Sequence, residues 1–175
     1  GKQEYEYSLL AKECGIEMPE TFLFEDKYFG VERFDRSIRG KLHVVSIAGL
    51  LCADYRIPCI DYLHILQVCA ELTHSIAELW KIYRLMVFNY LIGNKDDHAK
   101  NFSFIYRDED WHFAPAYDIL PSNGMYGFHT TSINDSITPT KEDLIAVATQ
   151  AGLPSKEAET IFNQIHTILK SKHQV

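Results

Sequence analysis

The stretch that decides the fold is Asp96-Asp97-His98-Ala99-Lys100-Asn101, and a further carboxylate follows it in Pro115-Ala116-Tyr117-Asp118. Asp96 and Asn101 are five positions apart, and Asp118 lies seventeen positions after Asn101. Phosphoryl transfer uses this set of side chains. One carboxylate accepts or orients the proton of the attacking hydroxyl, while an amide oxygen and a second carboxylate hold Mg²⁺ against nucleotide phosphates. The spacing is typical of protein-kinase-like folds and therefore favours a kinase.

The segments on both sides of this stretch predict how it is held. Residues 75–92 read as a helix that is apolar on most sides near its end, which indicates a central, buried helix. This helix runs directly into Gly93, so it would anchor Asp96 on the core of the domain. Residues 102–106 and 111–114 are predicted strands around a polar turn. Their hairpin would bring Asn101, at its start, close to Asp118, just past its end.

The remaining periodicity predicts an α+β fold that is mostly α, with a small β part on the N-terminal side. A helix over residues 5–14 ends at Gly15, and a tight turn at Arg39-Gly40 precedes an extended segment. The other expected elements are a hairpin (21–24 with 28–31), helices (46–53, 61–72, 144–151 and 155 to about 172) and a loop (121–136). Ser46 and Ser155 are the expected N-caps of the first and last of these helices, and Thr140 begins a capping box.

Composition limits the possible classes of function. A chain of 175 residues fits one domain, and its net charge of −7 argues against an extended nucleic-acid surface. A local basic patch stays possible, but a solvated hairpin is the favoured interpretation of its residues, Arg33, Arg36, Arg39 and Lys41. No run approaches the ~18 apolar residues that span a bilayer. The start lacks a secretion signal and an initiator Met, from which we expect a fragment or a processed chain.

The four cysteines favour a cytoplasmic compartment. They are Cys14, Cys52, Cys59 and Cys69, and no two of them form a CxxC pair. Three of the four have apolar sequence neighbours, so reduced thiols in the core are favoured over disulfides or a zinc site. Reduced thiols are typical of the cytoplasm.

The charged residues of the central stretch allow more than one interpretation. Asp96 and Asp97 follow a helix C-terminus, where the helix dipole favours cations, and such a local conflict indicates a functional site. The structural alternative is a polar loop in which an aspartate caps the next turn. His98 could orient Asp96, stabilise the loop or bind a metal, although Mg²⁺ prefers oxygen ligands. Lys100 could neutralise a transferring phosphoryl group or be solvated. Asp96, His98 and Lys100 are thus the candidate catalytic residues.

Three motifs in the same order resemble a known family. They are Glu32-Arg33-Phe34-Asp35-Arg36, Gly93 to Asn101 with Phe102-Ser103, and Ala114 to Pro121. Together they resemble HipA-type serine/threonine kinases, the toxins of bacterial HipBA and HipBST modules. The resemblance covers Glu4 to about Gly152. It implies one domain over residues 1–175, with a hinge-proximal helix and β-hairpins in 1–45 and a helical lobe of a protein-kinase-like fold in 46–175.

The resemblance also implies a role for each matched residue. Asp96 would be the catalytic base, and Asn101 and Asp118 would bind Mg²⁺. The remaining matched residues would serve ATP: Glu32 and Phe34 would meet the adenine through the hinge backbone, Asp35 would face the ribose, and Glu4 would pair with a phosphate-binding lysine.

The expected partners follow from the same resemblance. They are a protein substrate, such as an aminoacyl-tRNA synthetase, and an antitoxin of the HipB or HipS type. We expect no membrane contact, and nucleic-acid contact only through an antitoxin complex.

One departure from the family pattern leaves alternatives open. The glycine-rich phosphate loop and its lysine should precede Glu4, and Gly1-Lys2 is too short to be either. Because positioning and charge neutralisation supply most of the catalysis, a chain without them should transfer phosphate poorly alone. One alternative is a non-catalytic module that binds nucleotide or an antitoxin. Another is a metal-dependent hydrolase that uses Asp97, His98 and Asp118.

Overall fold

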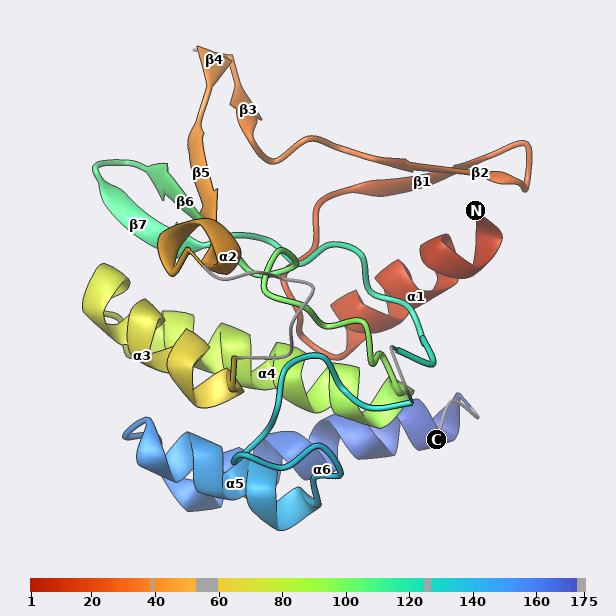
Figure 1. Ribbon diagram of the computed structural model, residues 1–175. Coiled ribbons are helices and arrows are strands. Elements are labelled where there is room, and N and C mark those ends of the chain that lie inside the picture. The colour runs from red at the N-terminus through yellow and green to blue at the C-terminus, as the bar shows by residue number, and fades with distance from the viewer. Residues whose placement is uncertain (39, 53–59, 125–126, 173–175) are drawn as a thin grey trace.

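The computed structural model describes residues 1–38, 40–52, 60–124 and 127–172 of the chain (Figure 1). The elements follow in this order: α1 (Lys2–Glu13), β1 (Thr21–Phe24), β2 (Tyr28–Val31), β3 (Arg36–Ser37), β4 (Gly40–Lys41), β5 (His43–Ser46), α2 (Ile47–Leu50), α3 (Tyr62–Thr73), α4 (Ile76–Ile92), β6 (Ser103–Arg107), β7 (Asp110–Phe113), α5 (Lys141–Gln150) and α6 (Ser155–Ser171). The α+β fold with predominant helix is confirmed. Arg39, Ala53 and Cys59, which entered the predictions, lie outside the described residues.

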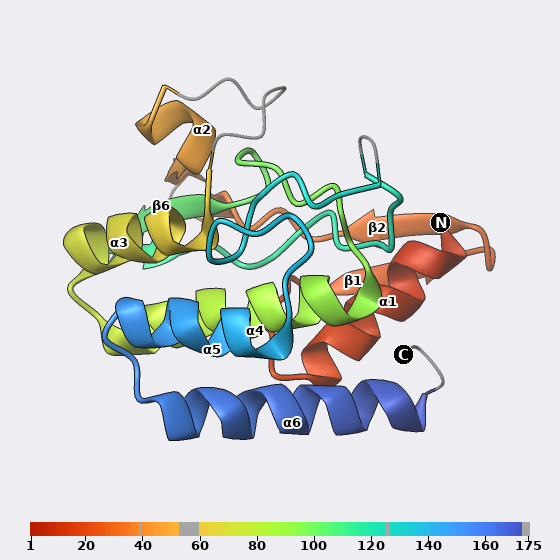
Figure 2. The same ribbon diagram turned by 60° about the horizontal axis from the view of Figure 1, so that its bottom comes forward.

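Helix α4 forms the centre of the molecule, as its apolar sequence predicts. Most of its side chains from Leu79 to Ile92 are buried, and α3, α5 and α6 pack against it. Figure 2 shows α6 running along α4 on the side away from β6. The hydroxyl of Tyr83 donates to the carbonyl oxygen of Ala158 at 3.1 Å and so attaches α6. Close packing of this kind supplies most of the stability of a helical lobe.

Local capping sets where the central helices begin and end. The side chain of Asp61 accepts a hydrogen bond from the amide of Leu63 and starts α3. Gly93 ends α4 in the left-handed conformation at φ 69°, which glycine adopts without steric cost. The expected cap at Ser155 is wrong by one position, because Pro154 is the N-cap and Ser155 is the first helical residue.

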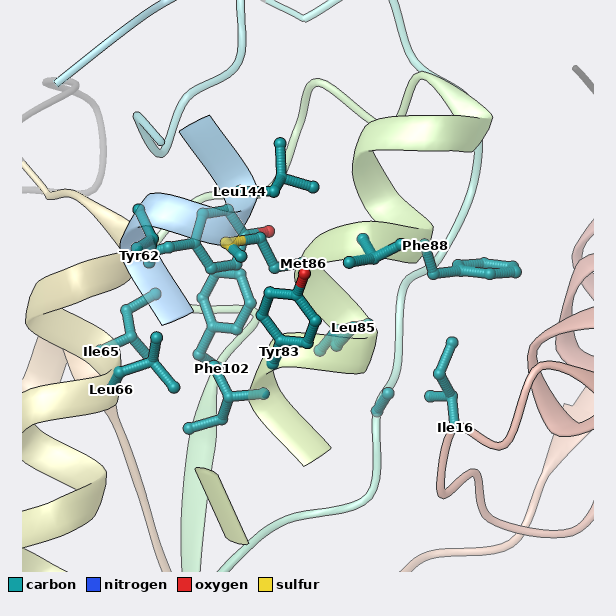
Figure 3. Packing of buried hydrophobic residues seen from close by; sticks show 14 of the residues in the cluster. Ile16, Tyr62, Ile65, Leu66, Tyr83, Leu85, Met86, Phe88, Phe102 and Leu144 are labelled. Atoms are coloured by element: carbon teal, nitrogen blue, oxygen red, sulfur yellow. The ribbon is translucent and has the colours of Figure 1, made fainter. Parts of the chain in front are cut away.

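A three-stranded antiparallel sheet, β5-β6-β7, covers one end of the helical lobe. Its β6–β7 hairpin is predicted by the sequence. The pairing of β5 with β6, from His43↔Tyr106 to Ser46↔Ser103, joins segments some sixty residues apart and was not predicted. Figure 3 shows the aromatic core beside this sheet, where the rings of Tyr62 and Phe102 meet edge to face at 5.3 Å.

The predicted hairpin β1–β2 is confirmed, with register Thr21↔Val31 to Phe24↔Tyr28. The hairpin lies beside α1 (Figure 1). A hydrogen bond of 2.8 Å between the hydroxyls of Ser8, on α1, and Thr21, on β1, joins the two elements. Within the described ranges, no helix combines the length and the apolar character needed to cross a bilayer.

Candidate active site

The loop that carries Asp96 is fixed at its start by the end of α4. The amide of Asn94 donates to the carbonyl oxygen of Asn89 at 2.9 Å, and the amide of Asp96 donates to the side-chain oxygen of Asn94 at 3.3 Å. The side chain of Asp96 is exposed, whereas Asn94 is buried. The Asp96 carboxylate therefore faces solvent while hydrogen bonds to the end of α4 fix its backbone. A carboxylate in this position can accept a proton from a bound hydroxyl.

Asn101 closes the same loop onto Asp96. Its side-chain amide nitrogen donates to the carbonyl oxygen of Asp96 at 3.1 Å, and its backbone amide donates to that of His98 at 2.8 Å. The amide nitrogen is therefore used inside the loop, and the side-chain oxygen is the atom that a cation would bind. His98 is half-buried in this turn, and Lys100 is exposed at its rim.

Asp118 lies in a pocket on the other side of the site. The pocket has a volume of about 140 Å³, and its walls include Glu4 and Ser8 of α1 and Phe29 of β2. Asp118 is exposed and has the left-handed backbone conformation, with φ 56°. Non-glycine residues in this conformation are uncommon and are concentrated at functional sites.

The chain beyond Asp118 returns to the start of the Asp96 loop. The amide of Ser122 donates to the carbonyl oxygen of Gly93 at 3.0 Å, and the amide of Lys95 donates to that of Ser122 at 3.3 Å. These bonds hold the segment after the second carboxylate against the loop that carries the first.

Tyr117 joins three of the predicted segments. Its hydroxyl donates to the carbonyl oxygen of Lys100 at 2.6 Å and accepts a hydrogen bond from the side-chain hydroxyl of Ser103 at 2.7 Å. Its ring stacks on Phe34, with ring centroids 5.8 Å apart. Burial, together with the charge of Asp118, raises the pKa of Tyr117, so its hydroxyl stays a donor at neutral pH. The structure thus brings Phe34, the Asn101 loop and Asp118 together.

The remaining predicted nucleotide-binding residues have other partners in this structure. Both oxygens of the Asp35 carboxylate bind the Arg33 guanidinium, at 2.9 and 2.7 Å, and Arg36 binds one of them at 2.6 Å. The hydrogen bonds from Arg33 hold the pKa of Asp35 below its usual range. Glu32 is exposed, with its amide bonded to the carbonyl oxygen of Glu20, and Glu4 is paired with the amino group of Gly1.

Asp97 is not a surface residue, unlike its neighbour Asp96. It is 1% exposed, and its carboxylate lies 2.9 Å from the hydroxyl of Tyr62, 3.1 Å from the Thr130 amide and 3.1 Å from the ring of His129. A metal ion could bind Asp97 only by breaking these bonds. In the part of the chain that the structure describes, no cluster of three or more histidine, cysteine or acidic side chains could hold a metal. The hydrolase alternative therefore loses the side chain on which it depended.

A sequence profile of the HipA-like C-terminal domain matches residues 1–172. The chain belongs to the HipA-like C-terminal domain family. Two similar proteins carry the name of putative kinases. Putative kinase Y4dM of Sinorhizobium fredii is 28% identical over an alignment of 179 residues. The alignment covers 89% of this chain and 44% of that protein. A putative kinase of Haemophilus influenzae is 28% identical over 139 residues, 68% of this chain and 40% of that protein. The HipA-like chain thus spans less than half the length of these relatives.

Two solved structures share the fold of this HipA-like domain. HipA of Shewanella oneidensis MR-1, in a complex with HipB and its operator DNA, matches with a TM-score of 0.75 at 18% identity, over 99% of this chain and 49% of that one. The Helicobacter pylori proinflammatory kinase CtkA matches with a TM-score of 0.54 at 13% identity, over 97% of this chain and 77% of that one. At these identities the likeness shows the fold, and it confirms the HipA-type, protein-kinase-like lobe.

The contacts of two residues of the candidate site were not predicted from the sequence. Tyr117 has no catalytic signature, and only its place beside Asp118 pointed to it. Asp97 was taken as a candidate metal ligand or a simple cap. The hydrogen-bond partners of Asp97 come from residues 129–131 and from α3. No local sequence pattern predicts contacts over such distances in the chain.

Proposed function

We propose that this HipA-like domain is the C-terminal lobe, with part of the hinge, of an ATP- and Mg²⁺-dependent protein serine/threonine kinase. The observation that carries the proposal is the hydrogen bond between Tyr117 and Lys100, because it joins the loop of Asp96 and Asn101 to Asp118. In this proposal Asp96, Asn101 and Asp118 would border one site, and Asp118 lines the neighbouring pocket. The names of the relatives as putative kinases support the same activity.

Each predicted residue has a role in this proposal. Asp96, exposed on a fixed loop, accepts the proton of the acceptor serine or threonine hydroxyl. Asn101 and Asp118 supply oxygen ligands of the kind that Mg²⁺ prefers. When bound, the ion neutralises charge on the nucleotide phosphates. Lys100, at the exposed rim, adds positive charge near the transferred group, and His98 supports the turn.

The nucleotide would lie over the pocket that Glu4 and Asp118 border. Val31, at the end of β2, also lines this pocket, and Glu32 and Phe34 follow it within three positions in the chain. Their backbone is the proposed contact for adenine, and Asp35 is the proposed contact for ribose. To bind the ribose, the Asp35 carboxylate would have to share or break its hydrogen bonds with Arg33. Glu4 is the proposed partner of a phosphate-binding lysine.

The wider role that we propose is that of a toxin in a bacterial toxin–antitoxin module, acting in the cytoplasm. Its substrate would be a translation enzyme such as an aminoacyl-tRNA synthetase, and its partner an antitoxin of the HipB or HipS type. The Shewanella protein of the same fold was solved with HipB and operator DNA, which supports an antitoxin partner. The net charge of −7 fits contact with DNA through that partner rather than directly.

The test is phosphate transfer by the gene product that carries this chain. It is incubated with labelled ATP, Mg²⁺ and a bacterial lysate, beside the Asp96→Asn variant. Labelling of serine or threonine that needs Asp96 supports a kinase. Equal labelling by both proteins rules out Asp96 as the base. Tight binding of ATP and Mg²⁺ without labelling supports the alternative of a non-catalytic module that binds nucleotide or an antitoxin.

A further inference from the structure

A buried chain of hydrogen bonds runs from Asp97 through two helices and back to Asp96. The hydroxyl of Tyr62, on α3, donates to Asp97 Oδ2 at 2.9 Å and accepts from Asn89 Nδ2, on α4, at 3.1 Å. Asn94 Nδ2 donates to Asn89 Oδ1 at 3.1 Å, and Asn94 Oδ1 accepts from the amide of Asp96 at 3.3 Å. The four side chains are buried. The backbone of Asp96 is therefore connected to the same network that holds the Asp97 carboxylate.

On its other side, Asp97 holds residues 129–131. Its Oδ1 atom accepts hydrogen bonds from the backbone amides of Thr130 at 3.1 Å and Thr131 at 3.3 Å. The hydroxyl of Thr131 also donates to the backbone carbonyl oxygen of Asp97. The hydroxyl of Thr130 donates to the carbonyl oxygen of Lys95 at 3.0 Å. The residues immediately before and after Asp96 are thus both bonded to one segment. That segment cannot shift without moving the backbone on both sides of Asp96.

The donors to Asp97 suggest that stability alone does not account for a carboxylate at this position. Among the described residues, a ring nitrogen of His129 lies 3.1 Å from its carboxylate, and Tyr62 and the two amides are uncharged donors. Burial and the nearby Asp97 raise the pKa of Tyr62 far above its usual value, so its hydroxyl remains a donor. Apolar residues of similar volume often stabilise a core as well as a buried ionic group does. Locally unfavourable choices of this kind are concentrated at functional sites.

We propose that Asp97 is a positioning residue of the phosphotransfer site, which holds the backbone of Asp96 between the α3–α4 core and the 129–131 segment. The inference rests on the proposed kinase function. Asp97 itself touches neither nucleotide nor acceptor. Its effect is on the geometry of Asp96, and a displacement of about 1 Å in a reacting group can lower a rate about 100-fold.

The decisive variant is Tyr62→Phe, which removes one buried hydroxyl and keeps the ring against Phe102. It disconnects Asp97 from Asn89 but leaves both threonine amides in place. Tyr83→Phe is the matched control, because Tyr83 is equally buried and its hydroxyl binds Ala158 on α6, away from the loop. The two variants lose the same group from the same core.

We expect Tyr62→Phe to lower kcat by about 10- to 100-fold and to leave the KM for ATP within about twofold. Tyr83→Phe should keep the kcat of the wild type. Amide hydrogen exchange gives a second readout, since exchange at Asp96 should accelerate in Tyr62→Phe and not in Tyr83→Phe. An active wild type with equal kcat in both variants overturns the inference and leaves the kinase proposal standing. All variants are made in the gene product that carries this chain, and an inactive wild type of that gene product overturns the kinase proposal itself.

A second variant keeps the test valid if Tyr62→Phe does not fold. Thr131→Val preserves the shape of the side chain and removes the hydroxyl that binds the carbonyl oxygen of Asp97. It should lower kcat in the same direction, with the KM for ATP unchanged. A wild-type kcat in Thr131→Val overturns the inference.

Discussion

The hydroxyl of Tyr117 donates to the carbonyl oxygen of Lys100 across 2.6 Å, and this contact joins the two chain segments that carry the proposed Mg²⁺ ligands. Lys100 directly precedes Asn101, and Tyr117 directly precedes Asp118. The Tyr117 side chain therefore links the two segments, although it is not itself a proposed ligand.

Tyr117→Phe should weaken the response to Mg²⁺. The variant keeps the stacking on Phe34 but loses the hydrogen bonds of the hydroxyl to Ser103 and to Lys100, of which the one to Lys100 joins the two ligand segments and is worth about 1 kcal/mol. We expect the Mg²⁺ concentration for half-maximal rate to rise about fivefold, the equivalent of that energy. Tyr106→Phe is the control, since Tyr106 is an exposed tyrosine on β6. A rate titration with Mg²⁺ measures the effect, and identical curves for both variants would contradict it.

Asp96→Asn should abolish most of the phosphate transfer without unfolding the protein. A general base contributes about 10²- to 10⁴-fold to a rate, and we expect a loss in this range. The Asp96 side chain is exposed, so the melting temperature should stay near that of the wild type. Asp108→Asn, in the exposed turn between β6 and β7, should change neither property. Loss of activity together with loss of fold would contradict a catalytic role.

Gly124→Ala should disturb the Asp96 loop from a distance in the sequence. Gly124 has φ 61°, and an added Cβ would lie 2.5 Å from the Phe128 carbonyl oxygen and 2.9 Å from that of Lys95. The overpacking should destabilise the protein by about 1–3 kcal/mol in addition to the cost of a left-handed backbone at alanine, and it should lower kcat.

Gly127→Ala is the matched control for Gly124→Ala. Gly127 also has positive φ, 81°, but no described heavy atom lies within 4 Å of its added Cβ. The control should show only the left-handed backbone cost of about 1–2 kcal/mol. Urea unfolding and kcat test both variants, and equal effects would argue against contact with the loop.

Glu78 should make stability depend on pH in the acid range. Burial by itself would raise the pKa of Glu78, but hydrogen bonds from Lys81 and from the Phe113 amide outweigh it, so the pKa lies below its usual range. A lowered pKa means that stabilisation is present above the unfolded-state pKa of about 4.3. It is lost as the pH falls through the lower folded-state pKa.

Glu78→Gln tests this prediction by urea unfolding between pH 7 and pH 3. The difference in unfolding free energy from the wild type should be full at pH 7 and should shrink as the pH falls below about 4. Glu71→Gln, an exposed change on α3, should give a small difference at every pH. A Glu78→Gln difference that stays constant with pH would contradict the argument.

The elements that the sequence predicted are those with local signals. Helix α4 has an apolar run that ends in a left-handed glycine, and β1–β2 has two apolar segments around a short polar turn. The pairing of β5 with β6 was missed because its partners lie far apart in the chain, and nothing in either strand specifies the other.

The same distinction applies to the candidate site. The order and spacing of Asp96, Asn101 and Asp118 were readable as a motif, and their roles remain proposals. The burial of Asp97 could not be predicted from the sequence, because a pair of adjacent aspartates does not indicate which of the two side chains faces the core. That orientation is decided by Thr130 and Tyr62, more than thirty residues away on either side.

The buried end of α4 has a further consequence for how the protein would lose activity. The Asp96 loop is connected by hydrogen bonds through Asn94 to the buried helix α4. We therefore expect that the loop does not unfold separately from the lobe. In a denaturant titration, inactivation and global melting should then fall on one curve, without a folded but inactive state between them.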